Sequence, residues 1–156
     1  MADELVDAFP AGAWFVSLSR LTDPALVVPT SAHTLGQQEV GSRPIQALLR
    51  EWVRTRRLLL LLDNCEQVLA AASEVADLLA NSSGLVVLAT SRVPLRLRGE
   101  REVAVLPLAL PPLAPAALRH QLPAERLTAF PAVALFMARA AQPDFALTDH
   151  TASAVA

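Results

Sequence analysis

The hydrophobic positions of the chain form three short, nearly unbroken runs, separated by longer stretches of mixed apolar and polar residues. The runs cover 13–18 (AWFVSL), 58–62 (LLLLL) and 85–89 (LVVLA). They are too short to cross a membrane, because a spanning helix needs about 20 apolar residues. Runs of this length are typical of strands that are covered on both faces. The pattern therefore predicts three strands of a sheet buried between helices.

Helices are predicted between the first two runs. Asp23 followed by Pro24 has the pattern of an N-cap and a first helical residue, so we expect a helix from there to about His33. A second helix is expected over 44–55, where apolar residues recur at helical spacing on one face.

A third helix is expected after the leucine run. Asn64 and Gln67 have the spacing of a capping box, which predicts a helix from there to about Ala80. Strands that alternate with helices favour a mainly parallel sheet, so the predicted fold class is α/β.

The second half of the chain is expected to be organised differently. Residues 102–106 predict one further strand, which would complete a core over 1–106. The proline-rich stretch 107–123 is typical of a linker. Pro131 is expected to open a helix, and 124–156 to begin a helical subdomain.

Polar residues follow two of the predicted strands. Asp63 and Asn64 end the leucine run, and Thr90, Ser91 and Arg92 end the next run. The carboxyl ends of parallel strands meet at one edge of the sheet, and ligands of open α/β sheets bind at that edge. We therefore favour a binding site over the alternative that these residues only cap the following segments.

Composition narrows the functional classes. The chain of 156 residues is 53% hydrophobic and 18% charged, with a net charge of −2, which indicates a globular protein. No basic excess points to nucleic acid, and no signal peptide or membrane span is recognisable, so a cytoplasmic protein is expected. Cys65 is the only cysteine, which rules out an internal disulfide. All thirteen basic residues are arginine, so no mechanism can use a lysine of this chain.

Four blocks of the sequence resemble a known family. AWFVSLSRLTDPALV, RRLLLLLDNCEQVL, LVVLATSRVPLRLRGEREVAVLPL and AVALFMARAAQPDFALTDHTASAVA are similar, in this order, to the NB-ARC-like domain of signal-transducing (STAND) P-loop ATPases. These domains occur in large bacterial transcriptional regulators of the LuxR and antibiotic-regulator types. The resemblance covers nearly the whole chain, and the DNCE and ATSR segments are its most specific parts.

The resemblance implies a nucleotide switch that binds ATP or ADP with Mg²⁺ and acts on other domains of the same regulator. Asp63 would be the Walker B magnesium ligand, and Arg92, with Thr90 and Ser91, would lie near the terminal phosphate. Asn64 stands where many relatives have a second acid. Glu66 is the nearest acid to replace it, which implies slow hydrolysis at most.

The sequence also departs from the family. The phosphate-binding loop G-x-x-x-x-G-K-[ST] is missing, since the chain has no lysine and its five glycines are scattered. The resemblance therefore implies a P-loop-type sheet without its first strand, as in a piece of a larger ATPase. We expect this chain alone to bind nucleotide weakly or undetectably, because backbone N–H groups must cradle the phosphates. The open strand edge would make the chain marginally stable or lead it to self-associate.

Two other functions remain open. A nucleotide-free interaction module or non-functional fragment would explain the missing loop. A receiver-like phosphoacceptor domain would use Asp63 and Thr90, but it also needs a lysine and an acidic pair that this chain lacks. Cys65 is expected to be a small buried residue rather than a nucleophile.

Overall fold

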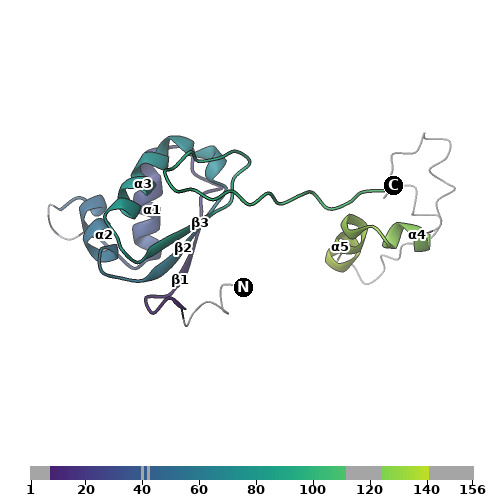
Figure 1. The fold of residues 1–156 in the computed structure, drawn as a ribbon, viewed down its shortest axis with the longest axis horizontal. Coiled ribbons are helices and arrows are strands. Elements are labelled where there is room, and N and C mark those ends of the chain that lie inside the picture. Colours follow the sequence, from purple (N-terminus) through teal and green to yellow (C-terminus); the bar gives the residue numbers. More distant parts are fainter. Residues whose placement is uncertain (1–7, 40, 42, 112–123, 141–156) are drawn as a thin grey trace. The chain divides into compact units, whose positions relative to one another are not determined.

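The computed structural model describes residues 8–39, 41, 43–111 and 124–140, and it divides into two compact units, 1–102 and 103–156. Unit 1 is an α/β unit with a parallel sheet and flanking helices, as the sequence predicts (Figure 1). No helix in the described ranges is long and apolar enough to cross a membrane. The expected division at 106 and 123 remains a prediction.

Three parallel strands form the sheet of unit 1, in the order β1 (Ala13–Ser17), β2 (Leu58–Asp63) and β3 (Leu85–Ala89). All three predicted runs are therefore strands. The register aligns Phe15 with Leu61 and Leu61 with Leu88. Because aligned residues of parallel strands point to the same face, each face of the sheet can be followed as rows across the three strands.

The helices of unit 1 lie between the strands in sequence. A 3₁₀ turn (Pro24–Leu26) leads into α1 (Val27–Thr34), and the Oδ1 atom of Asp23 accepts a hydrogen bond from Ala25 N–H at 2.9 Å, as a cap should. The second predicted helix is α2 (Ile45–Val53). Before α3 (Ala72–Ala80), the chain makes two 3₁₀ turns, at Cys65–Gln67 and Leu69–Ala71.

The capping box predicted at Asn64 and Gln67 is wrong. Asn64 has a left-handed backbone (φ 64°) and its side chain makes no capping hydrogen bond. Its backbone N–H is instead bound by the Thr90 hydroxyl, 26 residues away in sequence, at 3.0 Å. This tertiary contact fixes the chain in a turn, so the regular helix begins only at Ala72.

The core of unit 1 lies on one face of the sheet. Leu58, Leu60 and Leu62 of β2 are buried there, and the three helices add side chains that include Val27, Leu49, Val53, Val75 and Leu78. The other face carries exposed apolar residues: Phe15 is 60%, Val86 46% and Leu88 43% exposed. In the described part of the chain, helices thus cover one face, whereas the leucine run predicted cover on both. We call the second face the open face.

The predicted strand over 102–106 is also not formed. These residues have no strand pairing, and Val103 and Val105 are 84% and 90% exposed. The composition favours a strand, but a strand needs a neighbour to accept its backbone hydrogen bonds.

Unit 2 contains two short helices in its described residues, α4 (Ala124–Thr128) and α5 (Pro131–Arg139). Pro131 opens α5 as predicted, and Leu127 and Val133 are buried. Most of the expected linker over 107–123, and the part of the expected helical subdomain beyond residue 140, lie outside the described residues.

Candidate functional site

The carboxyl ends of β2 and β3 bring Asp63 and Thr90 together. The hydroxyl of Thr90 donates a hydrogen bond of 2.5 Å to Oδ1 of Asp63. The same hydroxyl oxygen accepts the N–H of Asn64 at 3.0 Å. The backbone carbonyl of Thr90 accepts the N–H of Cys65 at 2.9 Å, so the turn after β2 is tied to the end of β3 at two points.

Arg92 and Glu66 form the second contact of this edge. Nε of Arg92 lies 3.3 Å from Oε1 of Glu66, and the arginine side chain is 87% exposed whereas the glutamate is 18% exposed. The arginine is therefore held at one point and is otherwise in solvent. An exposed pair of this kind contributes little to stability, so the arginine can leave it at small cost.

The other predicted site residues, Ser91 and Asn64, make only local or backbone contacts at this edge. The Ser91 hydroxyl accepts the N–H of Val93 at 3.3 Å and so closes its own loop. Asn64 contributes its backbone but makes no side-chain capping bond. The catalytic roles expected for Asn64 and Glu66, the phosphate contacts of Thr90, Ser91 and Arg92, and metal binding by Asp63 all stay predictions.

Ser17 is a residue of this edge that the sequence analysis missed. It ends β1 and is aligned with Asp63 in the parallel register, so both lie on the open face. Its hydroxyl lies 3.0 Å from the Ser19 hydroxyl. The signal in the sequence was the serine near the end of the first run, because polar residues also stand at the ends of the other two runs.

Cys65 lies under this edge without taking part in it. It is 3% exposed, and its thiol lies 3.6 Å from the carbonyl oxygen of Leu62. Burial, together with the negative charges of Glu66 and Asp63, raises the pKa of the Cys65 thiol to about 11. A thiol that stays protonated at neutral pH is a poor nucleophile, which supports a packing role.

The edge fits a magnesium ion only in part. Mg²⁺ is usually held by one or two carboxylates, with phosphate oxygens and water as its other ligands. Asp63 is a half-buried carboxylate at a sheet edge, so it can supply one such ligand. No group of three or more His, Cys, Asp and Glu side chains among the described residues could hold a metal ion. These residues therefore suit a magnesium ion that arrives with phosphate, not one bound by protein alone.

A hollow of about 150 Å³ lies elsewhere in unit 1. Residues of three helices line it: Val28, Gln46, Arg50, Glu74 and Leu78. None of these residues belongs to the Asp63 edge. The hollow is therefore separate from the predicted site.

Comparison with known proteins relates the chain to large bacterial proteins. It is 34% identical over 157 aligned positions to proteins from Mycobacterium tuberculosis and Mycobacterium bovis, whose names assign them provisionally to the HTH-type transcriptional regulators. The alignment covers 99% of this chain but 15% of each relative, so the chain spans about one seventh of their length. No protein-family model matches the chain. No solved structure matches it significantly.

Proposed function

We propose that this chain is a regulatory domain of a transcriptional regulator, and that the Asp63 edge of its sheet responds to a magnesium nucleotide. The likeness to regulators over nearly the whole chain supports the first part. The observation that carries the second part is the hydrogen bond between Thr90 and Asp63, which joins the polar ends of two neighbouring parallel strands.

Each residue of this edge would have a limited role. Asp63 would supply one oxygen to a magnesium ion carried by the nucleotide, and Thr90 would hold that carboxylate in place. Arg92 would exchange its contact with Glu66 for a phosphate oxygen, because a guanidinium pairs well with phosphate. The magnesium ion would supply neutralising charge for the phosphates.

The chain lacks the parts that would make this binding tight. It has no lysine, and its glycines are too far apart for a loop of successive N–H groups around a phosphate. Binding by this chain alone should therefore be weak. That weakness suits a switch whose nucleotide is held jointly with further protein segments, and the chain spans only 15% of the length of its relatives.

Nuclear magnetic resonance is the suitable test, because it detects weak binding residue by residue. The ¹⁵N-labelled chain would be titrated with Mg²⁺–ATP and Mg²⁺–ADP into the millimolar range. We expect amide shifts centred on Ser17, Asp63, Asn64 and the 90–92 segment, and their loss in Asp63→Asn. Glu51→Gln, an exposed acid of α2, is the matched control and should leave the shifts unchanged.

Shifts that are absent, or that persist unchanged in Asp63→Asn, would overturn the nucleotide part of the proposal. The second candidate would then be a nucleotide-free interaction module. The exposed apolar residues of the open face favour that candidate, because exposed patches of this kind mark protein contacts.

A further inference from the structure

The outer edge of β3 offers hydrogen-bonding groups that the described residues do not use. Thr90 N–H donates to Leu62 O, and Leu58 N–H donates to Gly84 O, so the even-numbered residues of this segment face β2. The odd-numbered residues Leu85, Val87 and Ala89 therefore direct their backbone groups away from β2. Leu85 N–H is bound by the Ser82 hydroxyl at 3.1 Å. In the described part of the chain, the N–H groups of Val87 and Ala89 have no partner.

The sequence of β3 does not protect this edge. The strand reads LVVLA and contains no charge, no proline and no glycine. Natural edge strands usually carry such a feature, because an unprotected edge pairs readily with another strand. The exposed side chains of Val86 and Leu88 extend the apolar surface beside the edge.

We propose that β3 pairs edge to edge with β3 of a second copy of this chain. Two identical strands related by a two-fold axis must run antiparallel. If the axis passes beside Val87, the central residue of the strand, the Val87 N–H and C=O of each copy bond to those of the other. Ala89 N–H of each copy then donates to Leu85 C=O of the other. These four bonds use both free donors of each copy and leave the Ser82 bond intact.

The side chains are self-complementary in the same register. On the helix-covered face, Leu85 stands opposite Ala89 of the other copy, which pairs a large residue with a small one. On the open face, Val86 stands opposite Leu88 of the other copy, and these side chains are 46% and 43% exposed in a single copy. Every cross-strand pair is apolar, so the contact brings no charges together.

The contact between the two copies is small. A five-residue strand is about 17 Å long, so each copy contributes one short edge. Such an interface falls below the total area of about 1,200 Å² that separates weak complexes from standard ones. The dimer is therefore weak, with a dissociation constant on the order of 100 μM.

Sedimentation of the full chain between about 5 and 500 μM tests the pairing. The average mass should rise from the monomer value of 16.6 kDa towards twice that value. Val86→Lys places two charges into the contact from an exposed position, and it should raise the dissociation constant at least about tenfold. Circular dichroism would confirm that the variant is folded.

Phe15→Lys is the matched control. It makes the same kind of change on the same open face, at a residue that is 60% exposed. Phe15 lies on β1, however, which is at the opposite side of the sheet from the outer edge of β3. Edge pairing predicts that this variant associates like the unaltered chain. A chain that stays monomeric at 500 μM would overturn the proposal. So would equal loss of association in both variants, which would indicate face-to-face packing, or unchanged association in Val86→Lys.

Discussion

Thr90 at the end of β3 donates its hydroxyl hydrogen to the Asp63 carboxylate at the end of β2, across 2.5 Å and 27 positions of sequence. The same oxygen accepts the N–H of Asn64. A single side chain therefore holds both the direction of the carboxylate and the turn that follows it. The polar edge of the sheet is built around Thr90 as much as around Asp63.

Replacing Thr90 should weaken this edge. Thr90→Val keeps the shape of the side chain but removes the donor to Asp63 and the acceptor for Asn64 N–H. Because both groups can still reach water at this exposed site, we expect the free energy of unfolding in urea to fall by about 1 kcal/mol. Thr90→Ser retains the hydroxyl and should lose less than half of that amount. Equal stability of Thr90→Val and the unaltered chain would show that the bond contributes nothing net.

The contribution of Asn64 to stability should come from its backbone conformation and not from hydrogen bonds of its side chain. At φ 64° asparagine is tolerated better than most residues, and glycine is tolerated best. Asn64→Ala should therefore lower the free energy of unfolding by about 1 kcal/mol, whereas the stability of Asn64→Gly should remain close to that of the unaltered chain. The opposite order would mean that the asparagine amide makes a contact that outweighs the backbone effect.

The strands were predictable because each is a short, nearly unbroken run of hydrophobic residues. The five leucines at 58–62 identified β2, and the alternation of strands and helices identified the parallel sheet. The turn after β2 was not predictable in the same way. Its conformation depends on Thr90, a residue that is close only once the sheet has formed. Local spacing at Asn64 and Gln67 indicated a capping box that the tertiary contact overrides.

The position of the polar edge of the sheet could be predicted from the sequence, but not all of the residues that form it. Parallel strands bring their carboxyl ends together, which placed Asp63 beside Thr90. Ser17 belongs to the same row, yet its alignment with Asp63 depends on the register of β1, which no local pattern sets. The Glu66–Arg92 contact also depends on the 3₁₀ turn at Cys65–Gln67, where a regular helix was expected.

Gly84 should tolerate no side chain, because β3 begins against the backbone that precedes β2. A Cβ atom at Gly84 would lie 2.6 Å from the carbonyl oxygen of Arg56 and 2.9 Å from Cα of Arg57. The backbone of these two residues leads directly into β2 and cannot move away cheaply, so Gly84→Ala should cost about 1–3 kcal/mol of unfolding free energy. Ser83→Ala, at the exposed neighbouring position, is the control and should change stability little. A Gly84→Ala variant as stable as this control would contradict the close packing of the two segments.

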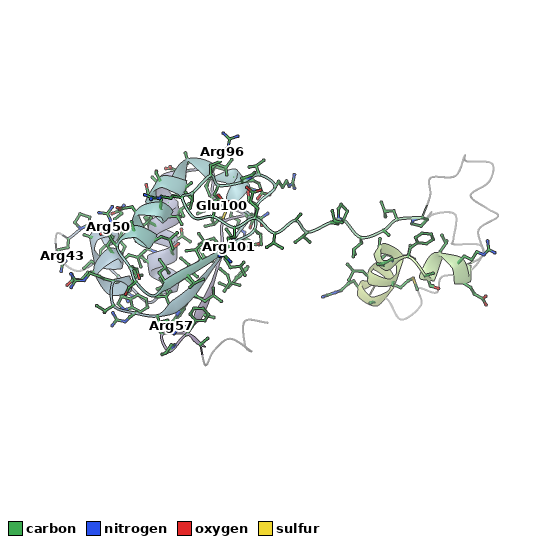
Figure 2. All side chains as sticks on the ribbon, viewed as in Figure 1. Arg43, Arg50, Arg57, Arg96, Glu100 and Arg101 are labelled. Atoms are coloured by element: carbon green, nitrogen blue, oxygen red, sulfur yellow. The ribbon has the colours of Figure 1, made fainter. Side chains whose placement is uncertain are left out.

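Glu100 should make the loop after β3 sensitive to acid. Its carboxylate accepts the backbone N–H groups of Leu97 at 2.9 Å and Leu95 at 3.0 Å, and Figure 2 labels it in unit 1. These two hydrogen bonds, that of Leu97 first, hold the pKa of Glu100 below its ordinary value of 4.5. The folded state therefore keeps this carboxylate charged to a lower pH than the unfolded state does. The resulting stability is present above pH 4.5 and is lost as the pH falls through the lowered pKa.

Glu100→Gln should remove this contribution. Urea unfolding at several pH values between 7 and 3 would measure the difference in unfolding free energy between the variant and the unaltered chain. We expect the variant to be less stable above pH 4.5 and the difference to shrink as the pH falls below that value. Glu102→Gln changes an exposed acid two residues away and serves as the control. A difference that stays constant with pH would mean that Glu100 acts through its shape and not through its charge, because a contribution of the charge must disappear when the carboxylate is protonated.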